Sequence, residues 1–172
     1  WKHGRADMRL SQCMIVKNEE RNIEKALSWG KDIVWEQIVV DTGSTDRTAE
    51  LAKKMGAKVF YFPWQDDFSA AKNFAISKAS GDWIAFLDAD EYFPPEETKK
   101  VMPLLERYDK GGYYAVMTSW LQVRGDESIF AGGTQARLFK RIEGLIYRNR
   151  IHEELSFHGM GITPYMADAT EL

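Results

Sequence analysis

The chain has a single cysteine, Cys13, among its 172 residues, and it has no long apolar run. One cysteine excludes an internal disulfide and a metal cluster built from several cysteine ligands. Cys13 stands within an apolar segment, where we expect it to be a small buried core residue. No apolar stretch approaches the roughly 20 residues that are needed to span a bilayer, and no secretory signal pattern opens the chain.

An excess of positive charge is also missing. The formal net charge is -3, so the chain offers no basic field to nucleic acid or to an anionic membrane surface. A composition that is 44% hydrophobic and 13% aromatic is that of a folded globular protein and excludes a disordered tail.

Internal repeats, low-complexity segments and obvious linkers are absent too, so we expect residues 1–172 to form one domain. The first residue is Trp1 instead of Met, and we expect a piece of a longer protein that is truncated at its C-terminal end. The pattern of residues changes after Gly112. We therefore divide the domain into an α/β part at residues 8–110 and a β-rich part at residues 111–172.

The first part alternates segments typical of strands with segments typical of helices, which indicates a parallel sheet with crossover helices. Strands are expected at residues 10–16, 37–40, 58–62 and 83–87. Asn18, Asp46 and Ser69 are the expected N-caps of the helices that connect them. A further helix is expected from Pro94–Pro95, since proline is tolerated in a first helical turn, and Pro103 should kink or end it.

The β-rich part contains segments typical of antiparallel strands. Residues 113–123 and 128–130 are expected to pair as a hairpin around a turn at residues 124–126. Two more short strands are expected at residues 136–141 and 145–147. Together with the first part, this pattern predicts an α/β domain with a smaller β-rich second part.

Three polar clusters fall where strands of the first part end, at residues 17–19, 41–46 and 88–91. In open parallel sheets, ligands bind in the crevice beyond the carboxyl ends of the strands. A nucleotide needs hydrogen-bond acceptors for its base and ribose, and its diphosphate needs a countercharge. Asp88 and Asp90 suit both tasks, because one carboxylate can face the ribose hydroxyls while the other holds a divalent cation such as Mg²⁺, which prefers oxygen ligands.

Each cluster also has a purely structural interpretation. Asn18 and Asp46 would only cap helices, Asp41 would only bond turn amides, and residues 88–91 would form a solvated loop. The context favours a binding site, because the two aspartates in 88–91 follow a very apolar strand and share their predicted sheet edge with Asp41.

Ordered motifs run along the chain at residues 14–20, 39–48, 67–73 and 81–91, and then at residues 137–140 and 151–154. In this order they resemble a family 2 glycosyltransferase with the GT-A fold, whose mostly parallel, Rossmann-like sheet has helices on both faces. The last two motifs resemble a bacterial subgroup that includes lipopolysaccharide-core transferases and glycosyltransferases with tetratricopeptide repeats, some of which modify peptide thiols. The resemblance extends from Leu10 to about Leu155.

The resemblance implies an inverting transfer of a sugar from a nucleotide-diphosphate sugar, most simply a UDP-linked one, to an acceptor. The donor-binding residues that it implies are Val16, Asn18, Asp41, Lys72 and Asp88. Val16 would line the base pocket, and Asp41 would accept a hydrogen bond from the base. Lys72 would lie near the diphosphate, and Asp88 would contact the ribose. The alternative for Lys72 is a solvated lysine on a helix.

The resemblance also implies a Mn²⁺ or Mg²⁺ cofactor held by Asp90, with His152 as a further ligand of the metal or the diphosphate. Bound metal would act as a Lewis acid on the departing nucleoside diphosphate. An inverting enzyme also needs a general base that deprotonates the acceptor. The Glu-Asp and Gln-X-X-Arg-Trp motifs that are frequent in family 2 are missing. Glu153 is therefore the candidate base, and Asp126 and Glu127 are the next candidates.

The implied acceptor is a glycan, a lipid-linked saccharide or a peptide, and we expect no nucleic-acid partner. For location we expect the cytoplasm, including the inner face of the membrane. Two other functions stay open: a nucleotidyltransferase of the same fold, and a nucleotide-sugar- or glycan-binding module without catalysis. The nucleotidyltransferase is disfavoured because the acidic residues in 17–20 would repel a triphosphate. A phosphoacceptor signalling domain is disfavoured by the β-rich second part.

Overall fold

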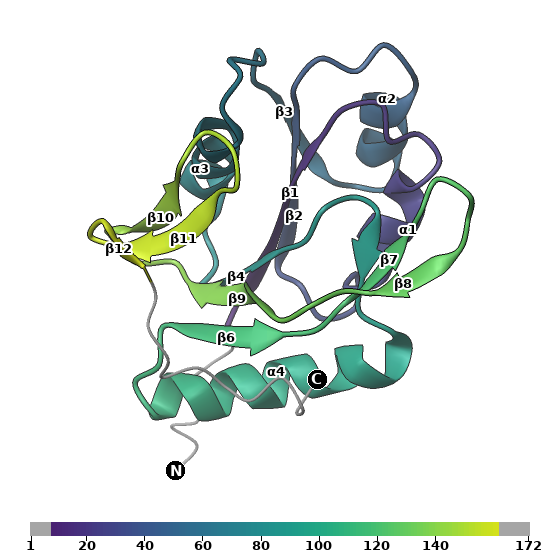
Figure 1. Ribbon diagram of the computed structural model, residues 1–172. Coiled ribbons are helices and arrows are strands. Elements are labelled where there is room, and N and C mark those ends of the chain that lie inside the picture. The colour runs from purple at the N-terminus through teal and green to yellow at the C-terminus, as the bar shows by residue number, and fades with distance from the viewer. Residues whose placement is uncertain (1–7, 162–172) are drawn as a thin grey trace.

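The structure, a computed structural model, describes residues 8–161 and contains a six-stranded sheet with strand order β3-β2-β1-β4-β9-β6 (Figure 1). The first seven elements are β1 (Leu10–Val16), α1 (Ile23–Ser28), β2 (Glu36–Asp41), α2 (Thr48–Lys54), β3 (Lys58–Tyr61), α3 (Phe68–Lys78) and β4 (Trp83–Phe86). β1 pairs in parallel with β2 and β4, and β2 pairs in parallel with β3. The predicted parallel sheet with crossover helices is confirmed.

The parallel strands are apolar because both faces of the sheet are covered. Every residue of β2 and of β4 is buried. Neighbouring residues point to opposite faces: Val39 packs with Met14 and with residues of α1 and α2, whereas Val40 packs with Cys13 and with Ala75 of α3. Helices therefore cover both faces, as predicted, and Cys13 is a buried core residue.

The chain after β4 adds antiparallel strands to the edge of the sheet and builds two smaller sheets. Its elements are β5 (Glu91–Tyr92), α4 (Pro95–Lys110), β6 (Ala115–Thr118), β7 (Leu121–Val123), β8 (Ile129–Ala131), β9 (Gln135–Lys140), β10 (Leu145–Arg148), β11 (Glu154–Phe157) and β12 (Met160–Gly161). β9 pairs with both β4 and β6, and the two small sheets are β5-β7-β8 and β10-β11-β12. In Figure 1, α3 lies beside the β10–β12 sheet, and α4 lies along β6.

The strand predicted at residues 113–123 is two separate strands. β6 joins the central sheet, while β7 pairs with β8 and forms the hairpin. The chain turns between β6 and β7 at Trp120, which is buried against Gly132. A Cβ atom at Gly132 would lie 2.1 Å from the Trp120 ring, so no larger residue fits there. The strands predicted at residues 136–141 and 145–147 are confirmed as β9 and β10.

Of the helix-end predictions, the start of α4 at Pro95 is confirmed, whereas the caps predicted at Asp46 and Ser69 are wrong. The N-cap of α2 is Arg47, one residue after Asp46, although Asp46 Oδ1 accepts a hydrogen bond of 3.0 Å from the N–H of Thr48, the first residue of α2. Helix α3 is instead capped by Asp67, while the Ser69 hydroxyl donates to the Asn149 carbonyl. Pro103 does not end α4, because the buried face of this helix packs on both sides of it and outweighs one lost hydrogen bond. No helix in residues 8–161 has the length and apolar character needed to cross a bilayer.

Candidate functional site

The loops that follow β1 and β2 are joined at the carboxyl edge of the central sheet. Asn18, whose φ of 53° lies in the left-handed region, accepts a hydrogen bond of 2.8 Å from the Thr45 N–H and donates its own N–H to Ser44 Oγ at 2.9 Å. Asn18 therefore does not cap α1, which starts only at Ile23, and the capping prediction is wrong. It holds the two loops together at an exposed position beside the sheet edge.

Asp41, the last residue of β2, is buried in the turn that follows. Its Oδ1 atom accepts hydrogen bonds from the N–H groups of Gly43 and Ser44 at 2.8 and 2.7 Å. The interpretation that Asp41 bonds turn amides is confirmed. Within residues 8–161 no donor engages Oδ2, but Asp41 is not among the residues that line the adjacent pocket, so its contact with a ligand stays a prediction. Val16 is buried at the end of β1 and lines a pocket with Thr42 of this turn.

Asp88, Asp90 and Glu91 form an acidic group in the loop after β4. One oxygen atom of each side chain lies within 4.8 Å of the others. Burial, followed by the negative charge of Asp88, raises the pKa of Asp90, although Gln122 of β7 donates a hydrogen bond of 3.0 Å to it. Carboxylates that are crowded in this way are stabilised by a divalent cation, which prefers oxygen ligands. The acidic group is thus the candidate metal site.

Glu91 forms a buried ion pair of 2.7 Å with Arg137 of β9. The second Glu91 oxygen accepts the Asp88 N–H at 2.7 Å, and the Arg137 guanidinium lies 4.2 Å from the centre of the Trp120 ring. Burial and the charge of Asp88 raise the pKa of Glu91, and Arg137 opposes this shift. Glu91 therefore fixes the acidic loop to β9. Both residues lie in the motifs at residues 81–91 and 137–140, but no spacing in the sequence predicts that they pair.

Lys72 of α3 and Glu153, which precedes β11, form an ion pair of 2.6 Å between Nζ and Oε1. The Lys72 side chain is 4% exposed, and its Nζ lies 4.7 Å from the centre of the Tyr147 ring. The interpretation of Lys72 as a solvated helix residue is wrong. Burial acts to raise the pKa of Glu153, but the hydrogen bond and charge of Lys72 outweigh it and hold this pKa below its ordinary value.

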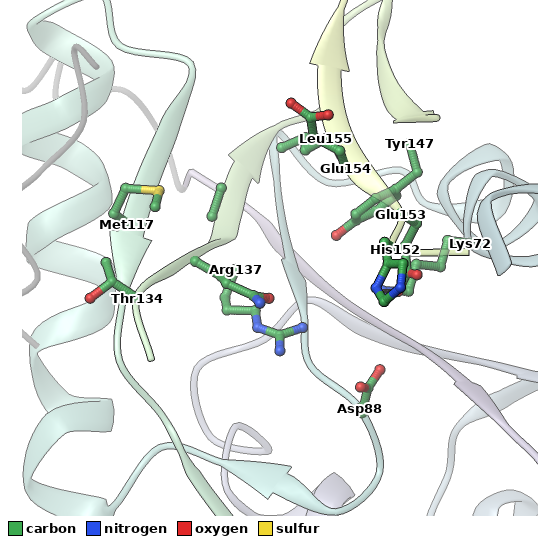
Figure 2. A pocket seen from close by; sticks show the side chains of 12 residues that line it. Lys72, Asp88, Met117, Thr134, Arg137, Tyr147, His152, Glu153, Glu154 and Leu155 are labelled. Carbon is green, nitrogen blue, oxygen red and sulfur yellow. Dashed lines mark ion pairs between the residues drawn. The ribbon is translucent and has the colours of Figure 1, made fainter. Parts of the chain in front are cut away.

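Two pockets meet at Lys72, Asp88 and Glu153. The smaller pocket, of about 390 Å³, extends from these residues toward the ends of β1 and β3. The larger pocket, of about 500 Å³, extends toward β9 and β11. Its lining includes Met117, Thr134, Gln135, Ala136, Arg137, Tyr147, His152, Glu154 and Leu155. Figure 2 shows Lys72, His152 and Glu153 grouped on one side of the larger pocket, with Arg137 across from them and Asp88 at its end.

The remaining predicted site residues fall inside and outside these pockets. His152 is exposed, has a φ of 53° and lines the larger pocket beside Glu153. It is not a member of the acidic group, so its role as a ligand stays a prediction. Asp126 and Glu127, the alternative bases, lie in the exposed turn between β7 and β8 and line neither of the two pockets.

Comparison with known proteins shows which family the chain resembles. The family model described as glycosyl transferase family 2 matches residues 11–169. A TPR repeat-containing protein of Synechococcus elongatus is 52% identical over 88 residues, which are 51% of this chain and 22% of that protein. A Rickettsia typhi protein named as an uncharacterized glycosyltransferase is 37% identical over 120 residues, which are 69% of this chain and 41% of that protein.

A solved structure is similar as well. The complex of Mycobacterium tuberculosis glucosyl-3-phosphoglycerate synthase with Mn²⁺ and UDP-glucose has a TM-score of 0.50 and 30% identity, over 59% of this chain and 40% of that one. The chain thus spans less than half the length of each of these three bacterial proteins. Its mainly parallel sheet, with helices on both faces, is the GT-A fold. The chain belongs to glycosyl transferase family 2.

Proposed function

We propose that this chain is a metal-dependent, inverting glycosyltransferase that moves a sugar from a UDP-linked donor to a glycan, a lipid-linked saccharide or a peptide. The observation that carries the proposal is the meeting of two pockets at Lys72, Asp88 and Glu153, beside the acidic group. In this proposal residues 8–110 bind the donor, and the part from residue 111 onward supplies the acceptor side. The similar structure that was solved with UDP-glucose supports the choice of donor.

The smaller pocket would take the nucleotide. Val16 contributes to its apolar lining, and the Oδ2 atom of Asp41 would accept a hydrogen bond from the base. Asn18 would shape this pocket by holding the loops after β1 and β2 together. Asp88 would face the ribose, and the Lys72 ammonium, which lines both pockets, would meet the diphosphate as a compact positive charge.

Mn²⁺ or Mg²⁺ would fit the acidic group. Asp88 and Asp90 are half-buried and close together, and a cation would relieve the repulsion between their charges. Glu91 is already engaged by Arg137 and by the Asp88 N–H, so we assign it to positioning. His152 would add a ligand to the metal or the diphosphate. A bound ion would supply Lewis-acid stabilisation of the departing diphosphate.

Glu153 would act as the general base. Lys72 lowers the pKa of its carboxyl group, which is therefore ionised at neutral pH and able to take a proton. Attraction of Lys72 to the diphosphate would loosen its hold on Glu153 and make the carboxylate more basic. The proton of the acceptor hydroxyl would pass to Glu153 while the acceptor oxygen attacks the anomeric carbon from the face opposite the diphosphate. The bond between that carbon and the diphosphate oxygen would break, and UDP would leave with the bonding electrons. A thiol acceptor, with its lower pKa, would demand less of this base.

A second candidate function is a nucleotide-sugar-binding module without catalysis. The ion pair between Lys72 and Glu153 favours it, because a carboxylate that is paired with lysine is a weaker base. Both candidates share the donor pocket and the acidic group. They differ in whether the bond between the sugar and UDP is broken.

Thermal unfolding and UDP release, measured with a panel of UDP-sugars in Mn²⁺ and in EDTA, test the proposal. A UDP-sugar that stabilises the fold in Mn²⁺ and releases UDP supports the enzyme, since selective binding stabilises the folded state. Stabilisation without UDP release, in the presence of candidate acceptors, supports the binding module. Absence of both effects contradicts both functions. The anomeric configuration of the product, read by NMR, tests inversion.

A further inference from the structure

Two exposed aromatic side chains form one wall of the smaller pocket. Trp64, in the segment after β3, is 36% exposed, and Phe68, the first residue of α3, is 40% exposed. Their rings make an edge-to-face contact with a centroid distance of 4.8 Å, and both residues line the pocket. Large aromatic residues usually gain stability from burial, so a contacting pair that faces a pocket points to a ligand.

The lining of this pocket combines apolar side chains with charged ones, and the charged ones are Lys17, Lys72, Asp88 and Glu153. Trp64 follows β3, at one end of the strand order, and Asp88 follows β4, on the far side of β2 and β1. The apolar residues Ile15 and Val16 at the end of β1 lie between them, and Lys72 lines the pocket as well. A ligand that suits this lining has a flat apolar ring at one end and an anionic group at the other.

The aromatic wall is held in place by hydrogen bonds. The Trp64 indole N–H donates to Asp66 Oδ1 at 3.0 Å, and the Phe68 N–H donates to the Arg150 carbonyl at 3.0 Å. The Arg150 Nε atom donates in turn to the Asp66 carbonyl at 3.3 Å. These bonds tie the wall to the segment that leads into His152. The two rings are therefore preorganised, which lowers the entropy cost of ordering them around a ligand.

We propose that Trp64 and Phe68 form the stacking surface for the nucleobase of the donor. This inference rests on the proposed function and extends it, since it assigns the base to an aromatic wall of the pocket that Val16 also lines. Nucleobases stack on aromatic side chains with favourable energy that depends little on the identity of the base. The Asp41 turn would then select the base, and the aromatic wall would supply affinity. The diphosphate would extend from this wall toward Lys72.

Calorimetric titration with UDP and with inorganic pyrophosphate, both in Mn²⁺, separates the base from the phosphates. Trp64→Leu should weaken the binding of UDP by about five- to 150-fold, which is the range expected for the loss of one stacked base. Phe68→Leu should weaken it in the same direction. Pyrophosphate, which has no base, should bind both variants as tightly as the wild type. Trp35→Leu is the matched control, because Trp35 is 54% exposed and lines neither pocket.

A second variant at Trp64 separates the loss of an aromatic ring from a loss of folding. Trp64→Phe keeps an aromatic ring and should retain most of the affinity for UDP, whereas Trp64→Leu should lose it at a similar melting temperature. Equal UDP affinity in the wild type and in the Trp64→Leu and Phe68→Leu variants would overturn the aromatic wall and leave the proposed function standing. Equal losses in Trp64→Phe and Trp64→Leu would also overturn it. A wild-type chain that binds neither UDP nor pyrophosphate would contradict the proposed function itself.

Discussion

Lys72 Nζ lies 2.6 Å from Glu153 Oε1, and this ion pair stands where the two pockets meet. Lys72 belongs to the α/β part of the chain, and Glu153 belongs to the β-rich part. The pair therefore joins the donor side of the proposed site to the acceptor side. An anion that draws Lys72 toward the smaller pocket would change the charge that Glu153 experiences in the larger one.

Lys72→Met should destabilise the fold and weaken the binding of UDP. The variant leaves Glu153 without its cation, and we expect the free energy of unfolding to fall by about 1–3 kcal/mol. This is less than the loss typical of fully buried pairs, because the Glu153 side chain is 21% exposed. Urea denaturation and calorimetric titration measure the two effects, with Lys72→Arg as the control that keeps a positive charge. Unchanged stability and unchanged UDP affinity in Lys72→Met would remove Lys72 from the site.

Glu153→Gln should leave donor affinity nearly unchanged and slow the transfer by roughly 10²–10⁴-fold, because a general base acts in the transition state. The measurement is the rate of transfer to the native acceptor at saturating donor, together with the donor affinity. Glu127→Gln is the matched control, since Glu127 is exposed in the β7–β8 turn. Normal turnover by Glu153→Gln would exclude it as the base, and a slow Glu127→Gln variant would transfer the role to that residue.

Arg137→Met should destabilise the fold strongly, because it leaves the buried Glu91 carboxylate without a cation. Breaking one partner of a buried ion pair costs about 3–5 kcal/mol. Glu91→Gln should cost less, since a neutral amide oxygen can still accept the Asp88 N–H. Chemical denaturation of the two variants checks this order. If Glu91→Gln were the more destabilising change, an unpaired Glu91 carboxylate would not be the main cost of breaking the pair.

The pH dependence of the free energy of unfolding should reveal the ionisation of Glu36. This residue lies at the start of β2, away from the pockets. Burial alone would raise its pKa, but hydrogen bonds from Lys58, Ser11 and Ser80 lower it from 4.5 to about 2. The folded pKa lies below the unfolded one, so the stabilisation is complete above pH 4.5 and is lost as the pH falls toward 2. A pKa shift of this size corresponds to about 3 kcal/mol, and screening by solvent reduces the expected stabilisation to about 2–3 kcal/mol.

Urea denaturation at pH 6 and at pH 3 measures this effect in the wild type and in Glu36→Gln. The wild type should lose more stability between the two pH values than the variant, which has no carboxylate at this position. An equal loss of stability in the two proteins would show that ionised Glu36 does not stabilise the fold as expected.

The position of the polar residues at the carboxyl edge of the sheet could be predicted from the sequence, because the strands that precede them are continuous apolar runs. β1, β2 and β4 are buried on both faces, and parallel strands bring the residues after them to one edge. Asp41 and Asp88 therefore fall where the pattern predicts. Buried parallel strands carry the strongest sequence signal in this chain.

The pairings within the site could not be predicted in the same way. Lys72–Glu153 and Glu91–Arg137 join residues on different elements. Their distances depend on how the β10–β12 sheet packs on the central sheet and on how β9 pairs with β4. The sequence predicts Asn18 as a helix cap because an asparagine that caps a helix and one that bridges two loops use the same hydrogen-bonding groups. Its left-handed φ and its bond to Thr45 appear only when the two loops are in place.

The most direct test of the account is calorimetric titration of UDP in Mn²⁺ and in EDTA, with the wild type and with Asp90→Asn. The account predicts that the wild type binds UDP much more tightly in Mn²⁺ than in EDTA, because the cation screens the diphosphate from the acidic group. Asp90→Asn should lose most of this difference while its melting temperature stays close to that of the wild type, since Asp90 is only half-buried and its charge is already disfavoured by burial and by Asp88. Equal UDP affinity in Mn²⁺ and in EDTA for the wild type would contradict a metal-bridged donor site.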